Sequence, residues 1–347
     1  MHAHPVRPAA TLGACLILGL AFCSAGCGPA TADPEPITTV GGKVSLTYLQ
    51  KQGDQEYFRE EAAGARARAT QLGVDLQVVD VGSDASRAVA EVRAAIGRKT
   101  NGLIVAAPDP AVGPQVAELA RSAKVALLAS DDELCTTDPV PSTCDKDQLV
   151  ARIGFSGTRM GAEVGKRAAQ EFAKSGWAQS DTRIVSAWKQ DVTVCQDRVN
   201  AAEDAFIATA GASIEKIAVP TDNTALGAQS RVAAILATHP RIRHWIVWGC
   251  NDENVQGGVT ALENAGFKAE DVIGVGLGAY LACKDWNGTK PSGMKAALFI
   301  NGKDVGALAV QTMYDKLKNG KDFPKEAFAK TTMVDATTWK SAGVSCS

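Results

Sequence analysis

Several apolar segments of strand length are followed by polar side chains that are able to bind hydroxyl groups. Lys51 and Gln55 follow the first such segment, Asp131 and Asp132 follow the fourth, and Asn251 follows a later one. Carboxylates, amides and ammonium groups form short, strong hydrogen bonds to hydroxyls. A few convergent polar groups of this kind are typical of a site for a neutral, polyhydroxylated small molecule.

Aromatic and further polar residues extend this candidate set. Tyr57 begins an Ala-rich helical pattern just after the loop that carries Lys51. An aromatic face of this kind can stack on the C–H face of a sugar ring. Arg198 lies inside the helical pattern that follows Trp188 and supplies a second cation. Further candidates at or near strand ends are Phe155, Trp188, Gln190, Trp248, Asp252 and Gly278.

Each candidate also has a purely structural interpretation. The acidic and amide pairs could cap the helices that follow them, because Asp and Asn are favoured at helix N-caps. The arginine could be an exposed partner of another charge on its own helix. The two tryptophans at strand ends could serve packing. Binding and structural roles both stay open at the level of the sequence.

The elements that must position these residues alternate regularly along the chain. From Val44 onward, strand-like runs such as the fully apolar segment 102–107 are followed by helical patterns. The alternation pauses at the loop between Cys135 and Cys144 and then restarts. Two such runs predict an α/β protein with two doubly wound parallel sheets. Ligands of these folds bind beyond the carboxyl ends of the strands, which is where the candidates lie.

Composition and motifs argue against several function classes. The 347 residues carry a formal net charge of −2, which gives no electrostatic reason to expect nucleic acid as a partner. Beyond the N-terminal segment only His239 and His244 remain, and neither follows a strand. No Walker-A loop or G-x-S-x-G elbow is present either. We therefore predict no enzyme activity, no metal site and no cofactor.

The N-terminus has the pattern of an export signal. An apolar run over residues 12–22 leads into Ser24-Ala25-Gly26-Cys27. It is too short to span a membrane as a mature helix and is typical of a signal peptide. We predict a lipoprotein signal over 1–27 with lipidated Cys27, or alternatively cleavage after residues 30–32. Residues 28–41 would be a flexible tether. Both alternatives export the protein, either anchored on the outer face of the bacterial cytoplasmic membrane or soluble in the periplasm.

Six cysteines remain after this segment, and an exported protein can form disulfides. Cys135 and Cys144 bracket a short Pro-containing loop, so we predict a local disulfide between them. The other four allow three pairings, and the sequence does not choose among them. They are Cys195, Cys250, Cys283 and Cys346.

A series of motifs resembles the sugar-binding proteins of ABC importers, and especially that family's arabinose-binding members. The resemblance covers the chain from about Lys43 to Trp339. In chain order the motifs are Lys51-Gln52 with Tyr57-Phe58, Pro108-Asp109-Pro110, Asp131-Asp132, His239-Pro240, His244-Trp245, Gly249 with Asn251-Asp252, Gly257-Gly258-Val259, Gly266-Phe267-Lys268-Ala269 and Asp271 to Gly276.

The resemblance implies a type I periplasmic-binding-protein fold, in which two lobes are joined by a three-segment hinge and close on one sugar. The N-terminal lobe would comprise residues 42–154 and 302–332. The C-terminal lobe would comprise residues 155–301 and 333–347. The family's pattern also implies which residues bind: Lys51, Asp131 and Asp132 from one lobe, Arg198 and Asn251 from the other, and Tyr57 stacking on the ring.

Departures from the pattern bear on the ligand. Gln55 stands where the arabinose-binding members have Glu, and Cys250 replaces a Met near the sugar. Gly278 and Leu281 stand where those members have Asn and Asp. An unmatched buried polar group costs about 1–3 kcal/mol, which is enough to change specificity. We therefore expect a related ligand, such as another pentose, a hexose or a sugar alcohol.

The resemblance implies a monomeric binding protein that delivers its sugar to an ABC permease with its ATPase. An alternative is a sensory subunit that presents the bound sugar to a chemoreceptor or a membrane kinase. The LacI-like transcription regulators share this fold, but they carry an N-terminal helix-turn-helix. This chain has an export signal in its place.

Overall fold

The computed structural model describes residues 39–135, 144 and 150–346. The predicted signal peptide, the lipidation site at Cys27 and most of the predicted tether lie outside the described residues. The last part of that tether does not extend freely into solvent. The Val40 amide donates a hydrogen bond to the Leu317 carbonyl at 2.8 Å, and Lys318 binds the Val40 carbonyl at 3.1 Å. These bonds hold Val40 in place, and the flexible tether stays a prediction.

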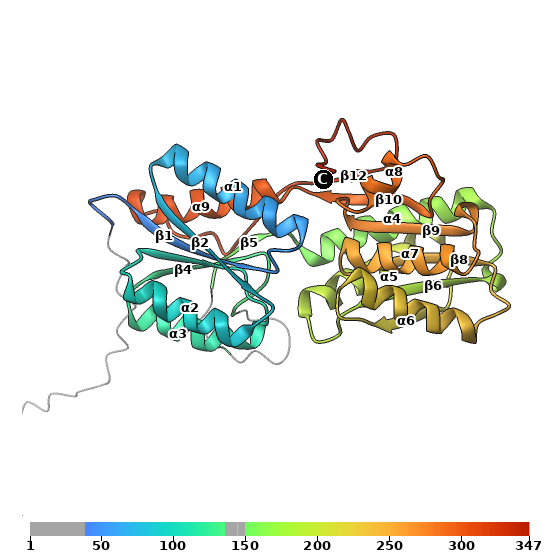
Figure 1. Ribbon diagram of the computed structural model, residues 1–347, viewed down its shortest axis with the longest axis horizontal. Coiled ribbons are helices and arrows are strands. Elements are labelled where there is room, and N and C mark those ends of the chain that lie inside the picture. Colours follow the sequence, from blue (N-terminus) through green and yellow to red (C-terminus); the bar gives the residue numbers. More distant parts are fainter. Residues whose placement is uncertain (1–38, 136–143, 145–149, 347) are drawn as a thin grey trace, which may run out of the picture. The chain divides into compact units, whose positions relative to one another are not determined.

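The first sheet contains six parallel strands in the order β11-β5-β4-β3-β1-β2. Figure 1 shows α1 and α9 on one face of this sheet and α2 and α3 on the other. The strands are β1 (Ser45–Lys51), β2 (Asp75–Gly82), β3 (Gly102–Val105), β4 (Ala126–Ser130), β5 (Arg152–Gly154) and β11 (Glu326–Phe328). The helices are α1 (Glu56–Leu72), α2 (Ala85–Gly97), α3 (Gly113–Ser122) and α9 (Gly302–Asn319).

The second sheet has the order β12-β10-β9-β8-β6-β7, and β12 runs antiparallel to β10. Its strands are β6 (Thr182–Trp188), β7 (Lys216–Pro220), β8 (His244–Gly249), β9 (Val272–Gly278), β10 (Met294–Ile300) and β12 (Thr331–Val334). Its helices are α4 (Gly157–Ser175), α5 (Thr193–Ala210), α6 (Ala225–Thr238), α7 (Asp252–Asn264) and α8 (Ala282–Asn287). Short 3-10 turns lie at Pro110–Val112, Gln179–Asp181 and Ala269–Asp271.

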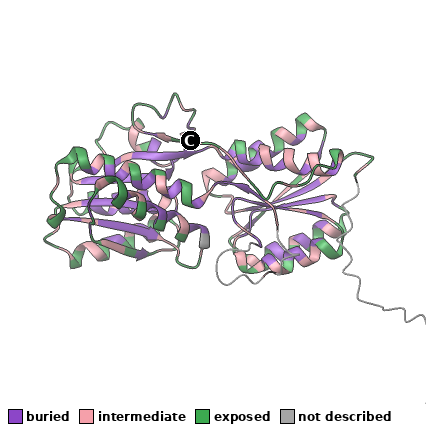
Figure 2. Ribbon diagram, turned by 180° about the vertical axis from the view of Figure 1, so that it is seen from behind, coloured by how far each residue is buried: buried purple, intermediate pink, exposed green. Residues whose placement is uncertain are grey.

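Side-chain alternation along the strands explains why both faces of the second sheet are covered. In β8, Ile246 and Trp248 pack in the cluster that contains the buried residues of α4 and α5. Trp245 and Val247 point the other way and pack in the cluster that contains α7. Successive side chains of a strand point to opposite faces, so each face needs its own helical layer. Figure 2 shows this arrangement as buried strands between helices with exposed outer faces.

The chain passes between the two sheets three times, from β5 to α4, from β10 to α9 and from β11 to β12. The second passage is held by Tyr280, whose hydroxyl donates to the Ile300 carbonyl at 2.7 Å and accepts from the Gly302 amide at 3.2 Å. Two doubly wound sheets were predicted, and this fold class is confirmed. The exact boundaries of the lobes stay a prediction.

Three disulfides lie in the described residues. The predicted bond between Cys135 and Cys144 is confirmed. The pairing that the sequence left open is resolved as Cys195–Cys250 and Cys283–Cys346. In the described part of the chain, no helix has the length and apolar character needed to cross a membrane.

Candidate functional site

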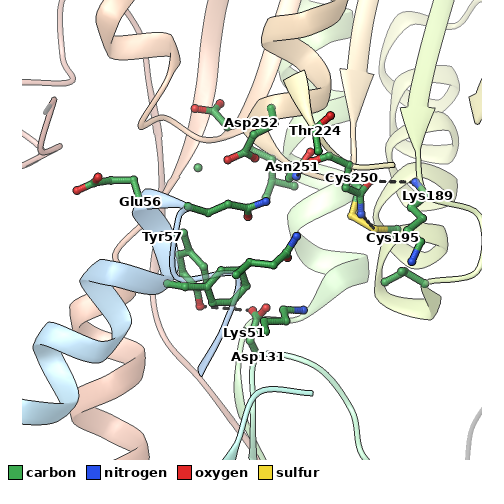
Figure 3. A pocket seen from close by; sticks show the side chains of 18 of the residues that line it. Lys51, Glu56, Tyr57, Asp131, Lys189, Cys195, Thr224, Cys250, Asn251 and Asp252 are labelled. Carbon is green, nitrogen blue, oxygen red and sulfur yellow. Dashed lines mark hydrogen bonds between the residues drawn. A yellow bond between two sulfur atoms is a disulfide. The ribbon is translucent and has the colours of Figure 1, made fainter. Parts of the chain in front are cut away.

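A cleft of about 480 Å³ lies beyond the carboxyl ends of strands from both sheets. Figure 3 shows its labelled side chains pointing toward one another from the two sides, with Lys51, Tyr57 and Asp131 facing Cys250, Asn251 and Asp252. Seven residues that we placed first among the candidates line it: Lys51, Gln55, Tyr57, Asp131, Asp132, Arg198 and Asn251. Their assembly in one cleft agrees with the strand-end argument, whereas their role in binding stays a prediction.

Lys51 and Asp132 form an ion pair at the floor of the cleft. Lys51 is the last residue of β1 and Asp132 follows β4, so two strands that flank β3 bring the partners together. Their side chains are only 11% and 4% exposed. Burial lowers the pKa of Lys51 to about 8, against the opposing pull of the Asp131 carboxylate. The ammonium group is therefore a poorly solvated donor that hydrogen-bonding ligand groups can reach.

Asp131 lies in the left-handed region at φ 61°, which turns its carboxylate toward Tyr57. The Tyr57 hydroxyl donates a long hydrogen bond of 3.4 Å to the Asp131 carboxylate. Gly154 makes this turn possible, because a Cβ at that position would lie 2.9 Å from the Asp131 Cα. Positive φ is uncommon for residues other than glycine, and Asp is among those that tolerate it best.

A buried polar cluster that the sequence analysis missed lies beneath this floor. Glu61 accepts hydrogen bonds from Tyr48, at 2.5 Å, and from Ser130. Burial, together with the nearby Asp131, raises the pKa of Glu61 to about 7. Glu61 follows Tyr57 by four residues on α1, so helical spacing places both on one face. That spacing was the available signal.

Arg198 reaches the cleft from α5 and is 8% exposed. Its Nη1 donates to the Cys250 carbonyl at 2.9 Å. Its Nε is buried and has no hydrogen-bond partner in the described part of the chain. Gly161 of α4 allows α5 to pack closely against that helix, because a Cβ at this position would lie 2.0 Å from the Arg198 carbonyl oxygen. An arginine with an unsatisfied buried N–H is well suited to a ligand oxygen.

Asn251 and Asp252 have structural contacts as well as positions in the cleft wall. The Asn251 side chain caps α7 by accepting from the Asn254 amide at 3.0 Å, and its Nδ2 donates to the Asn223 carbonyl at 2.9 Å. The Asp252 carboxylate accepts from the Leu281 amide at 2.6 Å. The capping interpretation is therefore right for Asn251, and Asp252 holds the turn after β9.

Four of the further candidates do not line the cleft. Trp248 is fully buried and donates from Nε1 to the Ser186 hydroxyl at 3.1 Å. Phe155 is buried and packs near the Tyr57 ring, with centroids 6.1 Å apart. Trp188 packs against the core, and Gln190 is also absent from the lining. Gly278 does line the cleft, at φ 135°.

The lining also contains residues outside the candidate set given above. Lys189 and Asn223 lie beyond β6 and β7, and Glu253 lies in the first turn of α7. Burial beside Asp252 raises the pKa of Glu253 to about 7. The Cys195–Cys250 disulfide forms part of the same wall (Figure 3). In the residues that the structure describes, no cluster of His, Cys, Asp and Glu is able to hold a metal ion.

Comparison with known proteins agrees with this geometry. The sequence is 25% identical over 302 residues to a protein of Azospirillum brasilense described as an ABC transporter L-arabinose-binding periplasmic protein, covering 86% of this chain and 88% of the relative.

Two crystal structures share the fold. One is an ABC transporter periplasmic solute binding protein from Actinobacillus succinogenes with bound D-allose, with a TM-score of 0.73, 22% identity, and coverage of 86% of this chain and 100% of the other. The second is the Caulobacter myo-inositol binding protein bound to myo-inositol, with a TM-score of 0.72, 18% identity, and coverage of 88% and 98%.

These relatives are binding proteins and not enzymes, which agrees with the prediction that the chain is not an enzyme. The family model described as the periplasmic binding protein domain matches residues 47–322. This span contains Lys51 and Asp132 beside the first sheet and Arg198 and Asn251 beside the second. It includes at least part of every strand except β11 and β12. The chain therefore belongs to the periplasmic binding protein domain family.

Proposed function

We propose that the protein captures a neutral monosaccharide or sugar alcohol in this cleft. The balance of buried charge carries the proposal. Lys51 and Arg198 supply two cations, and Asp131 and Asp132 supply two carboxylates, from both sides of the cleft. Such groups bind hydroxyls strongly, and their charges already compensate one another. A ligand with many hydroxyls and no net charge fits this set best.

Capture would occur by closure of two lobes, residues 42–154 with 302–332 and residues 155–301 with 333–347. The three passages between the sheets support this, because a few connecting residues can absorb the rotation of a hinge. A ligand that contacts Lys51 on one side and Arg198 on the other has more partners in the closed state. It therefore shifts the population toward closure.

The physiological role that we propose is delivery of the sugar to an ABC permease and its ATPase from outside the cytoplasm. The relationship to an ABC transporter binding protein supports this role. Cys27 would carry a lipid anchor, and the protein would act as a monomer. Replacing Cys27 with Ala should move the exported protein from the membrane fraction to the soluble fraction. Unchanged membrane association would contradict the anchor without affecting the binding proposal.

The identity of the sugar is best sought among several neutral candidates. Relatives are described as binding L-arabinose, D-allose and myo-inositol, so family membership does not select one. Gln55, Gly278 and Leu281 line the cleft of this chain and remove charged or amide groups from its wall. Those differences favour a ligand other than L-arabinose.

Calorimetry and thermal unfolding with a sugar panel test the proposal. The panel is L-arabinose, D-ribose, D-allose, D-galactose, myo-inositol and glycerol, with D-glucuronate as a charged control. A sugar at 100 times its Kd should stabilise the fold by about 2.7 kcal/mol. Arg198→Met should abolish this shift, whereas Arg159→Met, on the exposed part of α4, should retain it. Binding of none of the neutral compounds would refute the proposed ligand class.

A further inference from the structure

The Cys195–Cys250 disulfide joins two elements of the cleft wall. Cys195 lies in the first turn of α5, and Cys250 directly follows β8. Both are buried and both line the cleft. The bond closes a segment of 55 residues. It therefore fixes the position of the start of α5 relative to the end of β8.

Each of these cysteines lies within three residues of a side chain that we propose binds the sugar. Arg198 follows Cys195 by three residues on the same helix, and Asn251 follows Cys250 directly. The Arg198 Nη1 lies 2.9 Å from the Cys250 carbonyl oxygen and 3.7 Å from the Cys250 sulfur. The Arg198 guanidinium, on the helix that carries Cys195, is thus hydrogen-bonded to the backbone of Cys250. The covalent bond and this hydrogen bond fix the same separation.

Asn223 connects the disulfide to the rest of the wall. Its Nδ2 lies 3.4 Å from the Cys195 sulfur, and its carbonyl accepts from the Asn251 Nδ2 at 2.9 Å. Its Oδ1 accepts from the Lys189 amide at 2.9 Å and from the Asn254 Nδ2 at 2.8 Å. Asn223 has φ 64°, a conformation that Asn tolerates. Side chains and backbone around the disulfide therefore form one hydrogen-bonded unit.

We propose that the Cys195–Cys250 disulfide is a positioning element of the binding site, which holds Arg198 and Asn251 at the separation that sugar binding requires. A ligand bound through two fixed groups loses less conformational freedom than one that must order them first. Opening the bond would leave α5 and the end of β8 joined by noncovalent contacts alone. Affinity would fall while the fold remains. This inference rests on the proposed sugar-binding function.

The chain contains a matched control for a stabilising effect alone. The Cys283–Cys346 disulfide closes 63 residues, nearly the same length as the 55 closed by Cys195–Cys250. Loop-closure entropy depends on the logarithm of this length, so the two bonds should constrain the unfolded chain almost equally. Neither Cys283 nor Cys346 lines the cleft. If the two disulfides affect sugar binding differently when each is removed, the cause is their position relative to the cleft and not a general loss of stability.

The test compares Cys195→Ala/Cys250→Ala with Cys283→Ala/Cys346→Ala by calorimetry, well below both Tm values. The probe is whichever compound of L-arabinose, D-ribose, D-allose, D-galactose and myo-inositol binds the wild type most tightly. We expect at least a 10-fold higher Kd for the first variant and less than a 2-fold change for the second. Equal losses in both variants, or an unchanged Kd in the first, would overturn the inference.

Two further measurements test the same inference if the Cys195→Ala/Cys250→Ala variant folds poorly. Asn223→Gly retains the positive φ and the disulfide but removes the side chain that contacts Cys195, and it should also raise the Kd. Wild-type protein reduced with a thiol and then reoxidised should lose and regain affinity. An unchanged Kd in Asn223→Gly together with an unchanged Kd after reduction would refute the inference.

Hydrogen exchange separates this inference from the proposed function. In protein without sugar, peptides over residues 192–198 and 249–254 should exchange faster in the Cys195→Ala/Cys250→Ala variant than in the wild type. The same peptides should be unaffected in the Cys283→Ala/Cys346→Ala variant. If no panel sugar binds the wild type, the sugar-binding proposal fails, but unchanged exchange would still reject the positioning role.

Discussion

Lys51 and Asp132 form a buried ion pair across the ends of two strands that are not neighbours in the sheet, since β3 lies between them. The pair closes the floor of the cleft, and Asp131 adds a second carboxylate beside it. A buried pair contributes little to stability relative to apolar residues of the same size, but an unpaired buried charge is costly. Its position at the cleft agrees with the binding role proposed above, because the pair itself should add little stability.

Comparison of a single and a double variant of this pair should separate its effect on stability from its effect on binding. Lys51→Met leaves Asp132 without its cation and should lower the free energy of unfolding by about 3–5 kcal/mol. Lys51→Met/Asp132→Leu should recover part of this loss, because both charges are then gone. Urea unfolding measures the stability, and calorimetry with the best panel sugar measures binding. Both variants should bind at least tenfold more weakly. Recovered binding in the double variant would contradict the proposed role of the pair.

Glu61 should make stability depend on pH. Its pKa rises from the ordinary 4.5 to about 7 in the folded protein, mainly because it is buried. Between these two values the folded state binds the proton and the unfolded state does not, so this residue's contribution to stability falls as pH rises. The full effect is about 3 kcal/mol, at 1.36 kcal/mol per unit of pKa.

Glu61→Gln should remove that dependence. The amide can still accept from Tyr48 or Ser130, and it carries no proton that titrates. Relative to the wild type, the variant should therefore gain stability progressively from pH 4.5 to pH 7. Urea unfolding at several pH values measures the difference, in which the contributions of other carboxylates cancel. Parallel curves for the two proteins would show that Glu61 titrates normally.

Alternation of strands and helices predicted both sheets because it depends only on local periodicity. It also found Lys51 and Asp131, since the carboxyl ends of parallel strands meet at one edge. Trp248, the last residue of β8 before Gly249, points into the core with Ile246, so the packing interpretation holds for it. The last side chain of a strand still points to one face of the sheet or the other. The sequence alone does not tell whether that side chain faces the core or the cleft.

Residues missed by sequence analysis depend on contacts between distant segments. Asn223 enters the wall because its positive φ and its bonds to Asn251 and Lys189 hold it there. Nothing in its neighbours along the sequence marks that conformation. The pairing of Cys195 with Cys250 was equally out of reach, because four cysteines allow three arrangements. Their distance is set by how α5 packs beside β8.

Gln55 offers a test of specificity. It lines the cleft immediately before α1. A carboxylate there would be a charged acceptor, and hydrogen bonds to charged groups contribute about 1 kcal/mol more than neutral ones. Gln55→Glu should therefore strengthen L-arabinose binding by roughly fivefold relative to the best wild-type sugar. Calorimetry with both sugars measures this ratio. An unchanged ratio would show that Gln55 does not contact the ligand.

Gly161 should control the position of Arg198 through the backbone. A Cβ at Gly161 would lie 2.0 Å from the Arg198 carbonyl oxygen, so Gly161→Ala must push α5 away from α4. Because Arg198 is carried by α5, we expect weaker sugar binding and a loss of about 1–3 kcal/mol of stability from overpacking.

Gly97→Ala is the matched control for Gly161→Ala, since Gly97 ends α2 and a Cβ there would meet no atom within 4 Å among the described residues. It should leave sugar binding unchanged and stabilise the helix by up to about 1 kcal/mol. Thermal unfolding and calorimetry compare the two variants directly. At Gly161, α4 packs directly against the backbone of α5. The methyl group that Gly161→Ala adds would therefore displace the α5 backbone and not a flexible side chain. Normal affinity in Gly161→Ala would mean that Arg198 reaches the sugar independently of where α5 lies.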